Sequence, residues 1–327
     1  MEYVKLGNSD LMVSKVCLGC MGFGDANKGI HTWTLPYEES KDIIQYALEK
    51  GINFFDTAMA YQGGTSEEYL GRAIKECTNR EDVVIATKFH GRTLEQIRQG
   101  VTAREHIEMC LNESLKRLQM DYIDLYILHS WDDLTPIEET LEILNDMIHM
   151  GKVKYIGVSN CYAWQIAKAN EIANQKGWQP FISVQGHYNL IFREEEREMK
   201  PYCDLHGIAL TPYSVLASGR LATFKKTSKR MREDEYAKGK YDVTADQDLK
   251  IIQRVEELAN RKGVSMSGIA LAWLMRKVTS PIMGATKKSH IDGAIEAIKI
   301  KLTDEEMKYL EELYKPHALV GVMATIR

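Results

Sequence analysis

Asp56, Lys88 and His129 each close a short apolar run, and Tyr61 follows the first of them by five residues. A lysine ammonium beside a phenol favours the phenolate and lowers the pKa of the phenol. A carboxylate keeps that ammonium charged and oriented, and a histidine can polarise a carbonyl oxygen. Together the four groups would protonate an oxygen on which negative charge develops. A structural ion-pair cluster is the simpler alternative to a catalytic group. Which of the two is favoured depends on where the strands and loops place these residues.

Short, β-branched apolar runs alternate with longer helical patterns along almost the whole chain. Their spacing suits βα units, because one βαβ unit takes about 30 residues or more. Eight such units predict an α/β fold, a (β/α)8 TIM barrel whose parallel strands end at one common mouth. A doubly wound sheet is the competing architecture, but the sequence has no GxGxxG loop. The expected strands are Val16–Gly19, Phe54–Asp56, Val83–Lys88, Ile123–His129, Tyr155–Ser159, Ile182–Gln185, Ala209–Tyr213 and Pro281–Met283.

Two segments depart from this repeat. Tyr3–Leu6 and Leu11–Val13 predict an N-terminal β-hairpin that would plug one mouth of the barrel. The charged stretch Lys225–Asp246 is either a mobile lid over the site or a solvated insertion. Extra helices are expected near the C-terminus, over Gln247–Arg261 and Ser265–Arg276.

One helix carries a clear set of boundary signals. Thr135 is expected to cap it, with Pro136 at the first helical position and Glu138 completing a capping box. Gly151 is expected to close the same helix. These signals place the helix directly after the strand that ends in His129.

The bulk properties describe a globular chain, and residues 1–327 are expected to form a single domain. The net charge is −4 without a long basic run, so no nucleic-acid partner is expected. The sequence shows no signal-peptide pattern and no apolar stretch near the ~20 residues that span a bilayer, which predicts a cytoplasmic protein without a membrane partner. Cys17 and Cys20 form a CxxC pair, but no second pair accompanies it, so buried thiols are favoured and no metal is expected.

Six motifs, in order, resemble the aldo-keto reductases, and the resemblance runs from Leu6 to Tyr314. It implies that Tyr61 is the general acid, that Lys88 and Asp56 tune it, and that His129 orients the carbonyl. It also implies reduction of an aldehyde, ketone or sugar-phosphate carbonyl with hydride from a nicotinamide cofactor. The motifs are GINFFDTAMAY (51–61), VVIATK (83–88), MDYIDLYILH (120–129), GKVKYIGVSN (151–160), VQGHYNL (184–190) and TPYSVLASGRL (211–221).

The same resemblance implies an extended cofactor site along the barrel mouth. Ser159, Asn160 and Gln185 would hold the carboxamide, and Tyr213 would stack on the nicotinamide ring. NADP(H) is favoured and NAD(H) is not excluded, because His290 and Ala294 depart from the residues that the family often has there. The other residues implied for the cofactor are Gly19, Met21, Asp56, Ser214, Leu216, Ser218, Gly219, Arg220, Gly284, Thr286, Lys287, Lys288 and His290.

Four further stretches are similar to a bacterial subgroup that includes 1-deoxyxylulose-5-phosphate reductase-type proteins. They are HTWTLP (31–36), HSWDDLTPIEETL (129–141), HYNLIFREEEREM (187–199) and YKPHALVG (314–321). With Tyr61 and His129, Trp33 and Trp131 are the expected substrate residues. Arg193 is either a further substrate residue or part of a solvated helix.

Two other functions stay open. One is a cofactor-binding regulatory or redox-sensing subunit that resembles the potassium-channel beta subunits, because such relatives keep the four residues as well. The other is a barrel isomerase without a redox cofactor. The sequence leaves the oligomeric state open.

Overall fold

The computed structural model of the chain describes residues 1–224 and 232–325. Eight parallel strands form one sheet in the order β10-β3-β4-β5-β6-β7-β8-β9. Backbone bonds from Thr279 N to Leu210 O (3.0 Å) and from Ile282 N to Pro212 O (2.9 Å) join the two ends of this order, so the sheet closes into a barrel. The strands are β3 Cys17–Gly19, β4 Phe54–Asp56, β5 Val84–Phe89, β6 Ile123–Leu128, β7 Val153–Ser159, β8 Ser183–Gln185, β9 Ala209–Leu210 and β10 Ile282–Gly284.

The predicted (β/α)8 barrel is therefore confirmed, and β4 has the predicted bounds. The expected strand to Tyr213 is wrong in length, because β9 ends at Leu210. Thr211 N donates to Val184 O at 2.9 Å, whereas Pro212 has no N–H to donate on the side of the strand that faces β10. Beyond it, Tyr213 N still donates to Gly186 O at 3.0 Å, so the chain keeps following β8 to the mouth.

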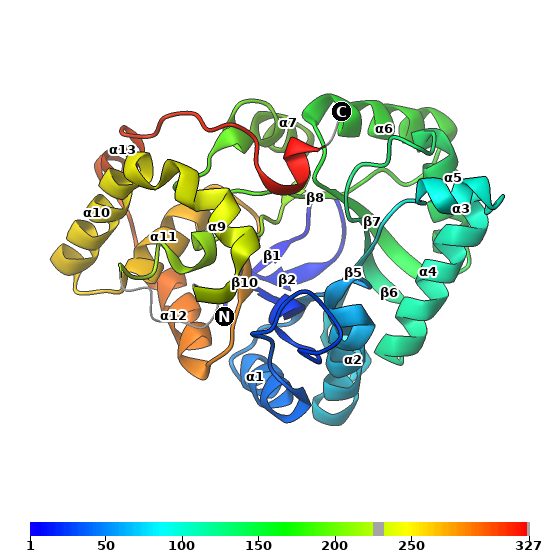
Figure 1. The fold of residues 1–327 in the computed structure, drawn as a ribbon, viewed down its shortest axis with the longest axis horizontal. Coiled ribbons are helices and arrows are strands. Elements are labelled where there is room, and N and C mark those ends of the chain that lie inside the picture. Colours follow the sequence, from blue (N-terminus) through cyan, green and yellow to red (C-terminus); the bar gives the residue numbers. More distant parts are fainter. Residues whose placement is uncertain (225–231, 326–327) are drawn as a thin grey trace.

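Helices surround the barrel (Figure 1). A large apolar cluster fills the space between strands and helices, and a smaller one fills the barrel itself. The strands are thus buried on both faces along most of their length, as expected for parallel strands. The helices are α1 Tyr37–Glu49, α2 Thr65–Cys77, α3 Leu94–Arg98, α4 Ala103–Leu118, α5 Ile137–His149, α6 Ala163–Lys176, α7 Met199–His206, α9 Glu235–Tyr241, α10 Ala245–Lys262, α11 Met266–Met275, α12 Lys288–Lys299 and α13 Asp304–Glu311.

The N-terminal hairpin, β1 Tyr3–Lys5 and β2 Met12–Ser14, is antiparallel, as predicted. Leu6, Leu11 and Val13 belong to the apolar cluster inside the barrel. A Cβ at Gly7 would lie 2.3 Å from the backbone oxygen of Ile182, just before β8, and only glycine permits this approach. The hairpin therefore closes the amino-terminal end of the barrel.

The predicted capping box at Thr135 is wrong. The N-cap of α5 is Pro136, with no side-chain cap bond. The Thr135 hydroxyl is buried and instead accepts a hydrogen bond from Arg92 Nη2 at 3.2 Å. Gly151 has a left-handed φ of 73° just beyond the helix, which agrees with the predicted helix end.

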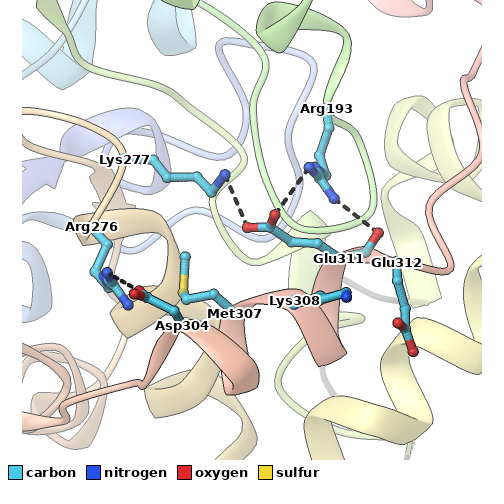
Figure 2. Close-up of a pocket in the computed structure, with 8 residues that line it drawn as sticks. All are labelled: Arg193, Arg276, Lys277, Asp304, Met307, Lys308, Glu311 and Glu312. Atoms are coloured by element: carbon cyan, nitrogen blue, oxygen red, sulfur yellow. Dashed lines mark hydrogen bonds and ion pairs between the residues drawn. The ribbon is translucent and has the colours of Figure 1, made fainter.

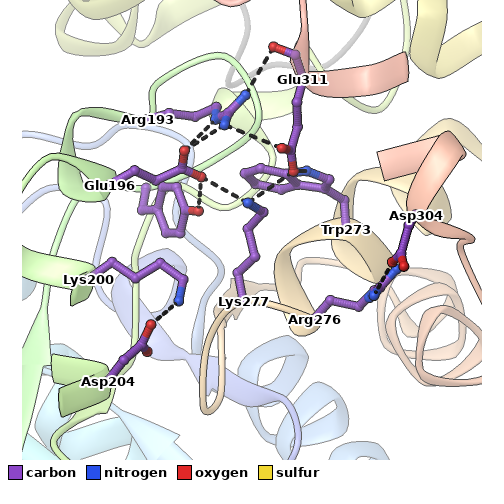
Figure 3. Close-up of polar contacts among 10 residues, drawn as sticks. Arg193, Glu196, Lys200, Asp204, Trp273, Arg276, Lys277, Asp304 and Glu311 are labelled. Carbon is purple, nitrogen blue, oxygen red and sulfur yellow. Dashed lines mark hydrogen bonds and ion pairs between the residues drawn. The ribbon is translucent and has the colours of Figure 1, made fainter. Parts of the chain in front are cut away.

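The expected extra helices are present as α10 and α11. The first part of Lys225–Asp246 lies outside the described residues, and its second part contains α9. An ion-pair cluster, shown in Figure 3, ties α13 to the segment after β8: Arg193 pairs with Glu196 (2.5 Å) and Glu311 (3.5 Å), and Lys277 pairs with both acids. Within residues 1–224 and 232–325, no helix is long and apolar enough to cross a membrane.

Candidate active site

The four residues singled out in the sequence meet at the carboxyl ends of β4, β5 and β6. Lys88 Nζ donates to Asp56 Oδ2 at 2.6 Å and to the Thr57 carbonyl oxygen at 2.6 Å. The same ammonium donates to Tyr61 Oη at 3.3 Å. The Tyr61 and His129 rings meet edge to face, with centroids 5.7 Å apart and an 80° interplanar angle. The phenol oxygen thus accepts from Lys88, which leaves the phenol proton available to another acceptor.

The loop after β4 brings Tyr61 back over the mouth. Met59 N donates to Lys88 O at 3.2 Å, and Tyr61 N donates to Ala58 O at 3.1 Å. Gln62 follows with a left-handed φ of 49°. Its buried amide donates to the carbonyl of His31 at 3.0 Å and fixes this turn against the loop after β3. A strained residue held this firmly is typical of a functional site.

Burial dominates the electrostatics of this group. Burial raises the pKa of Tyr61, and the nearby Lys88 opposes that rise. Lys88 therefore lowers the pKa of the Tyr61 phenol as expected, but the net shift of that pKa is upward. Burial alone would lower the pKa of Lys88, but Asp56 and Tyr61 outweigh it and the net shift is upward. A neutral phenol beside a charged ammonium results.

His129 follows β6 directly. Burial, then Lys88 and His90, hold the pKa of His129 well below its usual range, so the imidazole is neutral at pH 7. Its backbone is fixed on both sides, because His129 N donates to Phe89 O at 2.8 Å and His129 O accepts from Asn160 Nδ2 at 2.9 Å. A neutral imidazole next to the Tyr61 phenol can donate one hydrogen bond to a carbonyl oxygen.

The expected carboxamide residues form a connected row beside the four. Gln185 Nε2 donates to Asp56 Oδ1 at 2.9 Å, and Ser159 Oγ donates to Gln185 O at 2.8 Å. Asn160 has a left-handed φ of 50° and accepts from Tyr213 Oη at 2.8 Å. The row joins β4, β7, β8 and the segment after β9, so it offers amide and hydroxyl groups along the mouth.

The segment after Tyr213 has an unusual backbone. Ser214, Ala217, Ser218 and Gly219 have φ values of 56°, 48°, 53° and 97°, and turns of this kind expose N–H groups that favour anions. Arg220, which the resemblance implies for the pyrophosphate path, follows them in the chain. Its guanidinium, however, forms an ion pair with Asp242.

The residues that the resemblance implies for the adenosine end lie at β10 and at the start of α12. Gly284 is exposed, and no atom lies within 4 Å of where a Cβ would stand, so the backbone can be approached closely. Lys287 is the N-cap residue of α12, and Thr286 N donates to His290 Nδ1 at 3.3 Å. Lys288 pairs with Asp42 at 2.7 Å. A helix N-terminus with two lysines suits a phosphate group.

Helix α9 contributes residues that the strand-end rule did not indicate. Lys240 is buried and lies 4.9 Å above the Tyr213 ring. Tyr241 is buried as well, and its hydroxyl contacts His187 Nε2 at 2.7 Å. His187 in turn stacks on Tyr213, with centroids 5.5 Å apart. The sequence indicated only a charged stretch here, and that pattern did not show that Lys240 and Tyr241 would be buried.

The expected substrate residues flank the mouth. Trp33 is buried, with its ring 5.0 Å from that of His31, and it lies on the loop after β3. Trp131 N donates to Asn160 O at 3.2 Å, which places it next to the carboxamide row. Gly19 ends β3 in register with Asp56 and Gly284, and Met21 follows it.

Three other expectations concern residues outside this group. Cys17 and Cys20 are buried free thiols, and burial raises the pKa of both. Within the described ranges, no set of three or more histidine, cysteine or acidic side chains is arranged to hold a metal ion. Arg193 belongs to the ion-pair cluster of Figure 3, and its side chain is only 10% exposed, so it is not part of a solvated helix.

Arg193 also lines an open groove of about 600 Å³ (Figure 2). The groove carries four cations, and three of them, Arg193, Arg276 and Lys277, pair with acids of the same groove. Arg276 pairs with Asp304 at 2.9 Å, and Lys277 pairs with Glu311 at 2.9 Å. Volume alone therefore does not make this groove the functional site.

The chain belongs to the aldo/keto reductase family, whose model matches residues 15–315. The chain is 42% identical to versiconal hemiacetal acetate reductase of Aspergillus parasiticus over 98% of both proteins. It is 34% identical to norsolorinic acid reductase B of Dothistroma septosporum over 96% of this chain and 82% of the relative. A thermostable aldo-keto reductase solved with the inhibitor epalrestat superposes with a TM-score of 0.77 at 30% identity, covering 96% of this chain and all of the other.

The protein is thus an oxidoreductase of a family that uses nicotinamide cofactors. The expected bacterial subgroup is not supported, because these relatives are fungal reductases. One of the stretches that suggested the subgroup, HYNLIFREEEREM, contains Arg193 and Glu196 of the ion-pair cluster in Figure 3. Its residue types therefore reflect a structural role as well.

Proposed function

We propose that this protein reduces an aldehyde or ketone to the alcohol with NADPH, and that Tyr61 donates the proton. The observation that carries the proposal is the single ammonium of Lys88 shared between Asp56 and Tyr61, with His129 beside the phenol. Residues 1–327 would act as one catalytic domain.

The four side chains would divide the work in the following way. His129 donates a hydrogen bond to the carbonyl oxygen and orients it toward Tyr61. Lys88 stabilises the negative charge that Tyr61 acquires when its proton leaves, and Asp56 keeps Lys88 protonated and fixed. The neutral His129 does not compete as an acid, because its pKa is held well below the usual range.

The bound cofactor would supply the hydride that no side chain can provide. Ser159, Asn160 and Gln185 would bind its carboxamide, and Tyr213 would pack against its ring. The left-handed turn around Ser218 would hold the diphosphate, and Lys287 and Lys288 at the start of α12 favour a 2′-phosphate and hence NADP over NAD.

The substrate is proposed only by class. Two relatives are named for versiconal hemiacetal acetate and norsolorinic acid. A third, from Saccharomyces cerevisiae, is named a putative aryl-alcohol dehydrogenase, which supports aromatic carbonyl compounds as one arm of a screen. Trp33 and Trp131 would line such a pocket. A sugar-phosphate carbonyl stays the second arm, and a cytoplasmic location is proposed with either.

The test is NADPH oxidation by the purified chain over small aldehydes, ketones, aromatic carbonyl compounds and sugar phosphates, with NADH in parallel. We expect turnover with at least one carbonyl class and a higher kcat/KM with NADPH. Tight NADPH binding without turnover across the panel would favour the regulatory-subunit alternative. Absence of NADPH binding in a fluorescence titration would favour the isomerase alternative.

A further inference from the structure

The His129 side chain is held by other rings rather than by a hydrogen bond. Its Nδ1 is buried, and no hydrogen-bond partner for it lies in the part of the chain that the structure describes. Two rings contact the imidazole: Tyr61 meets it edge to face, and His90 stacks on it with centroids 4.4 Å apart and a 19° interplanar angle. Because the backbone of His129 is already fixed, these rings set the rotation of its side chain.

The backbone at His90 is held by contacts with two other elements. His90 directly follows β5, and its carbonyl oxygen accepts from His106 Nε2 of α4 at 2.9 Å. His106 is buried, and its Nδ1 accepts from Gln96 Nε2 at 3.2 Å, which is consistent with a proton on Nε2. A Cβ at the next residue, Gly91, would lie 2.2 Å from the Asp132 carboxylate, so the loop after β6 packs tightly here.

The charged and titratable groups around His90 come from three elements. Lys88 lies on its own strand, His129 and Asp132 follow β6, and His106 lies on α4. Burial and then Lys88 lower the pKa of His90, and burial lowers that of His129. Both rings are therefore neutral at pH 7 and can stack without repulsion, as aromatic pairs do.

We propose that His90 is a positioning residue, whose ring holds the His129 imidazole in the orientation that polarises the carbonyl. The inference rests on the proposed function, because it acts through His129. One face of the His90 ring is covered by His129, but the residue as a whole stays exposed to solvent, so it can be replaced without opening the core. What matters is a flat ring at this position and not the acid–base chemistry of an imidazole.

Three variants test this proposal: His90→Ala, His90→Asn and His90→Phe. We expect Ala and Asn to lower kcat by about 3- to 10-fold, the range of one stacking contact, with the NADPH dissociation constant unchanged. Phe should restore kcat to within about twofold of the parent, because it restores the ring. Thermal unfolding of all three should match the parent.

Each other outcome overturns the proposal. Equal kcat in the Ala variant and the parent would mean that His90 does not position His129. A higher KM at unchanged kcat would make His90 a substrate contact, and loss of kcat in the Phe variant would assign the effect to the imidazole itself. If the parent reduces no carbonyl at all, the proposed function fails instead, so the two failures are distinguishable.

Discussion

Two ion-pair clusters of this protein use the same kinds of group for different ends. Lys88 and Asp56 at the barrel mouth are 2.6 Å apart, and the lysine side chain is 0% exposed. Lys277 and Arg193 on the outer side pair with Glu196 and Glu311, and Lys277 keeps 18% of its side chain exposed. The mouth cluster adjoins a phenol with an available proton and a histidine with an unpartnered nitrogen, whereas the outer cations are matched by acids. A functional site thus differs from a purely structural ion-pair cluster in keeping donors and acceptors that are available to a ligand.

The largest expected effect comes from Lys88→Met. It leaves Asp56 buried without its cation, so the free energy of unfolding should fall by about 3–5 kcal/mol. The kcat for carbonyl reduction should fall by roughly 10²- to 10⁴-fold, because Tyr61 loses the group that stabilises its phenolate. Denaturant unfolding and steady-state NADPH oxidation measure the two effects. A variant with parental kcat would place Lys88 among structural residues.

Lys277→Met is the matched control in the outer cluster. It removes the ion pairs to Glu196 and Glu311, and we expect a loss of about 1–3 kcal/mol in the free energy of unfolding. The kcat should equal that of the parent, because among the described residues Lys277 forms its ion pairs with Glu196 and Glu311 and not with Asp56, Lys88, Tyr61 or His129. A loss of kcat in the folded variant would show that the two clusters are coupled.

Glu195→Gln probes a carboxyl that lies against Gly186, just beyond β8. Burial, and then the neighbouring Glu194, raise the pKa of Glu195 to about 8. A carboxyl whose folded pKa exceeds its unfolded value costs stability as pH rises from about 4.5 to about 8. The variant should therefore be more stable than the parent by about 1–2 kcal/mol at pH 9 and equal to it at about pH 4, below the unfolded pKa. Equal stability at both pH values would contradict a raised pKa.

Asp242→Asn should give the smallest effect. Asp242 pairs with Arg220 and has 40% of its side chain exposed, so the pair contributes little to stability. Freeing Arg220 for the diphosphate should tighten NADPH binding by about two- to fivefold, the range of one exposed ion pair. Fluorescence titration measures it, with Asp204→Asn, which breaks a surface pair with Lys200, as the control. Weaker binding in Asp242→Asn would show that the pair supports the cofactor site.

The sequence predicted the barrel and the convergence of Asp56, Lys88 and His129, because strand ends follow from hydrophobic pattern and parallel strands share one mouth. It did not predict the end of β9 at Leu210, or that the N-cap of α5 is Pro136 and has no side-chain hydrogen bond. Both features lie at or near a proline, whose effect on a strand or helix depends on the segments packed against it. The positions of Lys240 over Tyr213 and of His90 over His129 depend on contacts between segments far apart in the sequence, which leave no periodic pattern. The direction of the net pKa shift of Tyr61 was not predicted either, because the effect of burial outweighs that of the nearby Lys88 charge.

The most direct test compares Tyr61→Phe with the parent in NADPH oxidation, using 4-nitrobenzaldehyde, with NADPH binding measured by fluorescence on the same samples. We predict that both proteins bind NADPH and that the variant loses roughly 10²- to 10⁴-fold in kcat, because its ring has no proton to donate. Equal rates of NADPH oxidation by the variant and the parent would contradict the assignment of Tyr61 as the proton donor.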